Sequence, residues 1–154
     1  MQPISTFAAT DRDCPECASL LVEQLHEHDV HVSAESLRQV LEQVVADEQR
    51  GFVHLARAEG RVVGVAYVAT ILSAEHVGPA AWLEELYVTP AWRKRGVGSA
   101  LVAAVLERAR AAGMMAVDLE IDVGHGRAAS VYERAVFHRL ERSRWTRKLT
   151  SGAA

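Results

Sequence analysis

Residues 92–101 read WRKRGVGSAL and set three consecutive basic side chains against two glycines at the start of a helix-forming segment. The first N–H groups of a helix have no partner within the helix, and the helix dipole makes that end positive. Gly96 and Gly98 present no side chain, so a phosphate can approach these N–H groups closely. The basic residues 93–95 add full charges beside them. The stretch therefore predicts a pyrophosphate cradle, and the alternative is a plain strand-to-helix turn with solvated basic residues.

Around this stretch, the spacing of apolar residues predicts a mixed α/β chain. The segment 97–112 has a helical period and ends at Gly113, and strand 82–88 stops at Thr89-Pro90 just before the basic cluster. The other predicted helices are 13–28, one that follows Ser33, and 127–135, and the other predicted strands are 3–9, 52–57, 62–71, 117–123 and 143–149. This order predicts one domain over residues 1–154, with residues 150–154 as a loose tail.

Composition and charge narrow the class of protein. The chain has 154 residues, 49% of them hydrophobic and 24% charged, which is ordinary for one soluble globular domain. Its formal net charge of -3 argues against a protein that coats nucleic acid. The first residues lack a basic region followed by an apolar run, and no apolar stretch reaches membrane-spanning length. We therefore expect a cytoplasmic protein without a membrane or nucleic-acid partner.

The two cysteines, Cys14 and Cys17, raise the question of a metal or redox site. Asp13 resembles a helix N-cap, and Glu16 follows it at the spacing of a capping box. Both cysteines then share a helical stripe with Leu20, Leu21 and Leu25, where they would face the core as small apolar groups. A zinc site needs two further ligands at suitable spacing. The sequence favours packing over metal binding, and no metal site is predicted.

Two common phosphate-binding motifs do not fit the cradle. A Walker loop needs Gly-x-x-x-x-Gly-Lys followed by Ser or Thr, and a dinucleotide fingerprint needs a third glycine where Leu101 stands. Arg93-x-x-Gly96-x-Gly98, directly after the strand that ends in Val88, instead resembles the acetyl-CoA signature of the GNAT superfamily of N-acetyltransferases. The late segment 130–137, SVYERAVF, resembles the fourth helix of that family and its following turn. The resemblance covers roughly residues 3–149.

The resemblance implies a GNAT-like domain with a mixed, mostly antiparallel central sheet flanked by about four helices. It implies that acetyl-CoA is the co-substrate, with its pantetheine arm paired to the backbone of residues 86–88 and its pyrophosphate held by residues 94–99. A backbone N–H near Leu86 would polarise the thioester carbonyl. The implied cofactor contacts are Leu86, Tyr87, Val88, Arg93, Lys94, Arg95, Gly96, Val97, Gly98, Ser99 and His125.

The resemblance also implies an acid and a base for acetyl transfer. Tyr132 resembles the family's tyrosine that protonates or hydrogen-bonds the CoA sulfur, and a phenol donates without carrying charge at neutral pH. Glu84 and Glu85 follow each other on a strand, so alternation points their side chains to opposite faces. Similarity to the corresponding strand of diamine N-acetyltransferases favours Glu84 as the base or as an anchor for a cationic amine. Glu120 and Asp122 on the next strand are the alternatives.

Two positions depart from the family pattern. His125 stands where many members carry an asparagine that contacts the cofactor, and Val136 stands where a glycine usually precedes the phenylalanine. The expected acceptor is the primary amine of a small molecule, with a protein lysine or N-terminal amine as the alternative. A non-catalytic acyl-CoA sensor is the alternative from another class. Homodimers are common among such proteins, and Trp145 is the expected contributor to such an interface.

Overall fold

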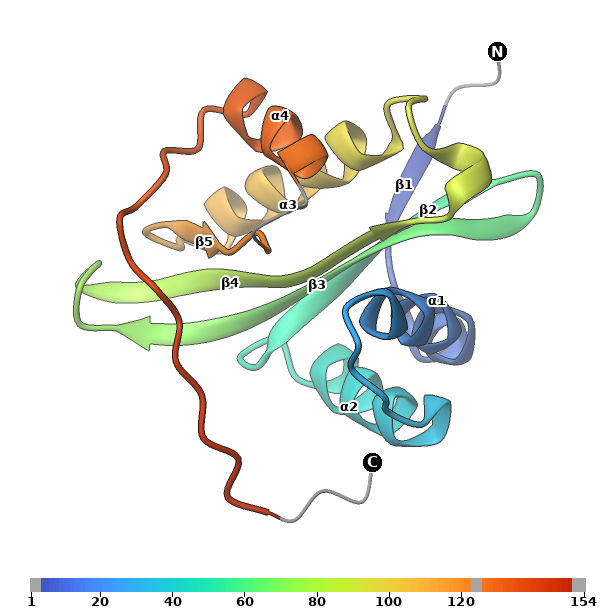
Figure 1. Ribbon diagram of the computed structural model, residues 1–154, viewed down its shortest axis with the longest axis horizontal. Coiled ribbons are helices and arrows are strands. Elements are labelled where there is room, and N and C mark those ends of the chain that lie inside the picture. The colour runs from blue at the N-terminus through green and yellow to red at the C-terminus, as the bar shows by residue number, and fades with distance from the viewer. Residues whose placement is uncertain (1–3, 123–125, 151–154) are drawn as a thin grey trace.

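The computed structural model describes residues 4–122 and 126–150. A five-stranded sheet lies between two layers of helices (Figure 1). Helices α1 (Cys14–Glu27) and α2 (Ala34–Ala46) cover one face, and α3 (Val97–Ala111) and α4 (Gly126–Arg134) cover the other. The predicted class, an α/β domain with four helices around a mixed sheet, is confirmed.

The sheet is antiparallel except at its last pairing. Its strands β1 (Ser5–Ala8), β2 (Gly51–Ala58), β3 (Arg61–Ser73), β4 (Gly78–Val88) and β5 (Val117–Leu119) lie side by side in chain order. The first three pairings are antiparallel: α1 and α2 lie in the chain between β1 and β2, whereas short turns join β2 to β3 and β3 to β4. The β4–β5 pairing is parallel because α3 carries the chain back across the sheet between them. β5 is therefore a short edge strand beside the longer β4.

Each face of the sheet has its own apolar core. On one face, Leu21 of α1 and Leu41 of α2 pack with Val53 and Val65 of the sheet. On the other face, α3 supplies a stripe of Val97, Leu101, Val105 and Ala109, all nearly inaccessible to solvent. Burial of these stripes fixes which face of β4 looks toward each helical layer.

Cys14 and Cys17 lie in the first of these cores, as the helical stripe predicted. Their residues are 1% and 0% exposed, and burial raises the pKa of the Cys14 thiol to about 11 and that of the Cys17 thiol to about 12. Such thiols are not ionised at neutral pH, so they serve as small apolar groups in the core.

Asp13 is the N-cap of α1, as predicted, but its side chain caps no N–H of this helix, so the predicted capping box is wrong. Asp13 instead accepts the Thr10 backbone N–H at 2.8 Å, in a capping box that begins at Thr10, and it pairs with Arg57 of β2. Glu16 accepts the Val62 backbone N–H at 2.8 Å, which ties α1 to the start of β3. Both carboxylates therefore stabilise tertiary contacts, a use that local spacing does not reveal.

The final predicted strand, 143–149, is also wrong. This segment has no strand structure, and the side chains of Trp145 and Leu149 are 90% and 91% exposed. Arg142 pairs with Glu75 at 2.8 Å and Arg144 pairs with Glu120 at 2.7 Å, so ion pairs hold the segment against the sheet edge. An alternating sequence forms a strand only where a neighbouring strand offers a free ladder.

No helix in the parts of the chain that the structure describes is both long enough and apolar enough to span a bilayer. Residues 151–154, most of the expected loose tail, lie outside the described residues.

Candidate functional site

Only part of β4 pairs with a strand on both edges, and the candidate site lies where the second partner strand ends. Along residues 81–83, β4 pairs with β3 on one edge and with β5 on the other. β5 ends at Leu119, whereas β4 continues to Val88 beside β3 alone. Residues 84–88 therefore have one free edge, and we call this part the open half of β4. The open half lies between α1 on one face and the start of α3 on the other (Figure 1).

A β-bulge separates the two halves. Tyr67 of β3 lies opposite Glu85, and the next residue, Val68, lies opposite Leu83, so Glu84 is an extra residue on β4. Leu83 and Tyr87 are four positions apart and would share a face in a regular strand. Instead Leu83 packs in the core beneath α3, and Tyr87 packs in the core beneath α1. The bulge thus removes the alternation that assigned Glu84 and Glu85 to opposite faces.

Register decides which backbone groups face the free edge. Thr89 donates its N–H to the Val63 carbonyl at 2.9 Å, and Tyr87 lies two residues earlier, opposite Val65, so the backbone groups of Tyr87 point toward β3. The backbone groups of Leu86 and Val88 then point away from β3, toward the free edge. Of the predicted pantetheine contacts, Leu86 and Val88 have backbone available, whereas Tyr87 contributes its side chain to the core.

The carbonyls on this free edge already have side-chain donors. Gln24 of α1 donates its Nε2 to the Leu86 carbonyl at 3.1 Å. Arg93 donates its Nε to the Val88 carbonyl at 2.9 Å and its Nη2 to Glu27 at 3.2 Å. Helix α1 and the loop after β4 therefore hold the free edge from two sides.

The predicted cradle lies at the start of α3. Gly96 is the N-cap in the left-handed region with φ of 82°, and no side chain caps the first turn. Lys94 also has a positive φ of 60°, so the loop curls tightly before the helix. A Cβ on Gly64 of β3 would lie 2.9 Å from Leu101 and 3.0 Å from Val97. The bare Gly64 lets the first turn of α3 approach β3 and the open half of β4 closely.

The side chains of the signature divide into three groups. Arg93 is directed back to β4 and α1, as described above. Lys94, Arg95 and Ser99 are exposed at the mouth of the helix, with the Arg95 guanidinium 4.9 Å from the ring centre of Trp92. Val97 is 1% exposed and anchors the loop, so only its backbone can face a ligand.

A hollow of about 320 Å³ runs between α3 and α4 beside this loop. Apolar side chains make up most of its wall, and Ser99 and Arg134 supply the polar part. Arg134 was not predicted as a site residue, although its place two positions after Tyr132 puts it on the same short helix.

Glu85 is the most strongly perturbed carboxyl group of the site. Burial is the main cause that raises its pKa to about 7; the negative charges of Glu84 and Asp122 raise it further, Arg144 lowers it, and Glu120 has the smallest effect. A carboxyl group that is half ionised near neutral pH can accept and release a proton there. Glu85 therefore has the electrostatics of a general base.

The other candidate carboxylates have different surroundings. Surrounding protein atoms partly desolvate the Glu84 carboxyl group and raise its pKa, an effect that Arg144 opposes, although solvent still reaches the residue. Glu120 is paired with Arg144 at 2.7 Å, and Asp122 is paired with His28 of α1. Glu120 and Asp122 thus each have a basic side chain as partner, whereas Glu85 is surrounded mainly by like charges.

Tyr132 of α4 lies within the electrostatic range of Glu85. Burial, and then the Glu85 charge, raise its pKa to about 12, so the phenol keeps its proton throughout the neutral range. Helix α4 ends directly after it in a Schellman turn: Phe137 donates its N–H to the Tyr132 carbonyl and Val136 donates its N–H to the Glu133 carbonyl, each at 3.0 Å. The Phe137 ring packs edge-on against the Tyr132 ring, with centroids 5.7 Å apart. This turn fixes Tyr132 over the apolar core beneath α3.

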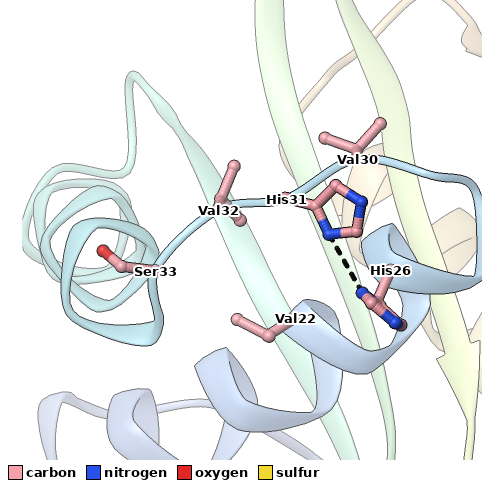
Figure 2. Close-up of a pocket in the computed structure, with 6 residues that line it drawn as sticks. All are labelled: Val22, His26, Val30, His31, Val32 and Ser33. Atoms are coloured by element: carbon pink, nitrogen blue, oxygen red, sulfur yellow. Dashed lines mark hydrogen bonds between the residues drawn. The ribbon is translucent and has the colours of Figure 1, made fainter. Parts of the chain in front are cut away.

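The other predicted features have little bearing on the site. His125 lies outside the described residues, so its predicted cofactor contact stays a prediction. Figure 2 shows a second hollow, of about 280 Å³, at the turn between α1 and α2, where the Nδ1 atoms of His26 and His31 lie 3.1 Å apart. In the described residues, no group of three or more His, Cys, Asp or Glu side chains is arranged to hold a metal ion.

The sequence model of the acetyltransferase (GNAT) family matches residues 15–137. This match covers more than half of the chain, so the chain belongs to that family and is an N-acetyltransferase, as the signature indicated. Acetyl-CoA is the acetyl donor typical of the family. No curated protein sequence matches the chain.

Solved structures share the fold over nearly the whole chain. An integron cassette protein from the mobile metagenome of Cole Harbour Salt Marsh is 20% identical, with a TM-score of 0.83 over 96% of this chain and 91% of that one. The aminoglycoside N-acetyltransferase AAC(6')-Iy, in complex with CoA, is 19% identical, with a TM-score of 0.80 over 96% of each chain. A ribosomal-protein-alanine N-acetyltransferase from Brucella melitensis biovar Abortus 2308 is 16% identical, with a TM-score of 0.76 over 96% of this chain and 100% of that one.

Proposed function

We propose that this GNAT-family enzyme acetylates the primary amine of a small cationic molecule, with Glu85 as the general base and Tyr132 as the acid. One observation carries the proposal: a carboxyl group with a pKa of about 7 lies at the bulge of β4, and its charge acts on the buried Tyr132 phenol. Acetyl transfer needs a base for the amine and a donor for the leaving sulfur at neighbouring positions. We therefore favour Glu85 over Glu84, the first choice from sequence.

The residues around the free edge fit acetyl-CoA. The uncapped first turn of α3 offers N–H groups to the pyrophosphate, and Lys94 and Arg95 add charge beside it. The N–H groups of Leu86 and Val88 face the free edge, where an extended pantetheine arm would add like a strand. Ser99 and Arg134 line the hollow between α3 and α4, which would take the nucleotide end. Acetyl-CoA supplies the acetyl group as a thioester.

The proposed steps leave all atoms and charges balanced. The Glu85 carboxylate takes a proton from the ammonium group of the acceptor, directly or through water, and the freed nitrogen attacks the thioester carbon. The Leu86 N–H donates to the carbonyl oxygen as negative charge develops on it. The Tyr132 hydroxyl donates its proton to the sulfur as the carbon–sulfur bond breaks, and the acetylated nitrogen, which still carries two protons, releases one through water that restores the Tyr132 hydroxyl. The products are the N-acetyl amine and the CoA thiol, and Glu85 releases its proton to solvent.

Charge at the site supports a small cationic acceptor. Glu84, Asp122 and Glu120 make the electrostatic potential around Glu85 more negative, as their effects on the pKa of Glu85 indicate. An aminoglycoside acetyltransferase bound to CoA shares the fold. Aminoglycosides and polyamines are positively charged amines, which a negative potential attracts. A ribosomal-protein-alanine acetyltransferase also shares the fold, so a protein N-terminus is the alternative acceptor.

The direct test is a thiol-release assay with acetyl-CoA against polyamines, aminoglycosides and peptides. We expect turnover with the small polycations and not with peptides. Because Glu85 must be ionised to act, kcat/KM should rise with pH and level off above a midpoint near 7. Turnover with peptides alone would replace the small-molecule acceptor by a protein. Absence of turnover with every acceptor would contradict the proposal.

Substitution of Tyr132 tests the acid. We expect Tyr132→Phe to lower kcat about thirtyfold, because the proton donor is lost while the ring that packs on Phe137 is kept. Calorimetry should give an acetyl-CoA Kd within about twofold of the wild-type value, because the proposed phosphate contacts lie on α3. An unchanged kcat would remove Tyr132 from the mechanism.

A further inference from the structure

Gln24 is the one polar side chain classed as buried within the described residues, with 9% of the residue exposed. It lies on the apolar stripe of α1 that also carries Cys17, Leu20 and Leu21. Every other member of this stripe stabilises the core by burying apolar surface. An amide at such a position is unfavourable unless all of its hydrogen-bonding atoms are satisfied.

The Gln24 amide is only half satisfied. Its Nε2 donates to the Leu86 carbonyl at 3.1 Å, while its Oε1 is buried without a hydrogen-bond partner. Rotating the amide by half a turn would place Oε1 against the Leu86 carbonyl, so that two acceptors would face each other. The contact with Leu86 therefore fixes the orientation of the amide, and the orphaned acceptor is its cost.

The contact matters because of where Leu86 lies. Leu86 is the second residue after the extra residue Glu84, where the ladder is disturbed, and its N–H and carbonyl share the free edge of β4. β3 alone orders this part of the strand on its other edge. A donor from α1 that holds the Leu86 carbonyl also fixes the direction of the Leu86 N–H.

We propose that Gln24 is a positioning residue for acetyl transfer, which holds the Leu86 carbonyl so that the Leu86 N–H is aligned for the thioester oxygen. The inference rests on the proposed function, in which this N–H stabilises the developing charge. It explains why a buried amide with an orphaned oxygen stands in an apolar stripe. A donor that is aligned before reaction needs no reorganisation during it.

The test compares Gln24→Met with the wild-type enzyme. Methionine has a similar length and no hydrogen-bonding amide, so the variant loses the Leu86 contact and the orphaned oxygen together. We expect kcat to fall at least about tenfold, with KM for acetyl-CoA within about twofold, and Tm to stay level or rise by about 3 °C. Gln43→Met on α2 is the matched control, because the exposed Gln43 amide bonds only to a carbonyl of its own helix. A wild-type kcat for Gln24→Met would overturn the proposal.

Gln24→Glu gives a second readout, which a purely structural role would not produce. The introduced carboxyl group can donate to the Leu86 carbonyl while it is protonated, and it repels that carbonyl once it is ionised. We therefore expect the ratio of this variant's activity to that of the wild type to fall with rising pH, at pH values where circular dichroism shows both proteins folded. Parallel pH profiles would overturn the proposal.

One measurement separates the failure of this inference from the failure of the proposed function. The amide NMR signal of Leu86 should shift when acetyl-CoA is added to the wild-type protein, and the shift should shrink by at least half in Gln24→Met. This result supports the positioning role even if the acceptor panel shows no turnover. An equal shift in the two proteins would overturn it even if the enzyme proves active.

Discussion

The closed and open halves of β4 belong to one strand and carry different kinds of interactions. In the closed half, residues 78–83, Ala80, Ala81 and Leu83 are at most 3% exposed. There the Ala81 N–H donates to the Ala116 carbonyl at 2.9 Å, and the Pro79 carbonyl accepts from Met115 at 2.8 Å. In the open half, the edge carbonyls bond to side chains of other elements, and a carboxyl group there has a pKa of about 7.

The difference shows how one strand can contribute to stability along one half and leave the other half available for the proposed chemistry. The closed half contributes apolar burial and satisfied backbone groups, which are the ordinary sources of stability. The open half carries a partly buried acid among like charges, and the Gln24 side chain of α1 that bonds to it has an orphaned amide oxygen; both features reduce stability. Substitutions in the open half should therefore lower activity without lowering stability, whereas substitutions in the closed half should lower stability without lowering activity.

The largest expected effect comes from Glu85→Gln in the open half. Loss of the base should lower kcat/KM about a thousandfold at pH 8 and remove the pH dependence near 7. The folded-state pKa of Glu85 is raised above that of an unfolded glutamate, so its ionisation destabilises the fold as pH rises from about 4.5 through about 7. The neutral glutamine should therefore raise the free energy of unfolding by about 2 kcal/mol at pH 8 and change it little at pH 4.

Steady-state assays and urea denaturation at the two pH values measure both effects. Glu107→Gln is the control, because it removes an exposed carboxylate from α3. A Glu85→Gln variant that is both active and less stable would contradict the assignment of Glu85.

The opposite signature is expected for Leu83→Ala in the closed half. Leu83 is 3% exposed in the core beneath α3, so truncation should lower the free energy of unfolding by about 3 kcal/mol. The kcat per folded molecule should stay within about twofold of wild type. Leu72→Ala is the matched control, because Leu72 lies on β3 with 85% exposure and should change stability by less than about 0.5 kcal/mol. A tenfold loss of kcat in Leu83→Ala would mean that the two halves are not separable.

The smallest effect concerns the turn that holds Tyr132 at the site. Val136 has a φ of 65° in the Schellman turn, and a β-branched residue is strained in this region, whereas glycine is not. Val136 is 74% exposed, so its side chain contributes little apolar burial. Val136→Gly should therefore raise the free energy of unfolding by about 1 kcal/mol, measured by urea denaturation, with kcat unchanged. Ala135→Gly, one residue earlier and outside the positive-φ region, should lower it.

Most of the fold could be predicted from the sequence because local patterns determine it. Periodic apolar residues located α1, α2 and α3, and the stop at Thr89-Pro90 placed the end of β4 correctly. The prediction failed where a partner decides the structure. β5 ends at Leu119 rather than at 123, because its partner β4 carries the bulge directly after Leu83, and the 143–149 segment forms no strand, because no described strand pairs with it.

The site was only partly predictable for a similar reason. Gly96 and Gly98 were enough to predict the proposed phosphate cradle, because local sequence determines where a helix starts. The choice between Glu84 and Glu85 depended on alternation, which the bulge cancels, and on charges from the residues that follow β5 and from the 143–149 segment. Gln24 left a sequence signal that was not used: a polar residue three positions after Leu21 on an otherwise apolar stripe.

The extra residue at Glu84 also limits which insertions and deletions β4 can tolerate. A loss of one codon at the bulge would restore regular alternation and exchange the inward and outward faces of either the closed or the open half. Point substitutions act on one half at a time, but a deletion acts on both. We therefore expect insertions and deletions to be tolerated in the turn at residues 74–77, between β3 and β4, and to be selected against at residues 83–86.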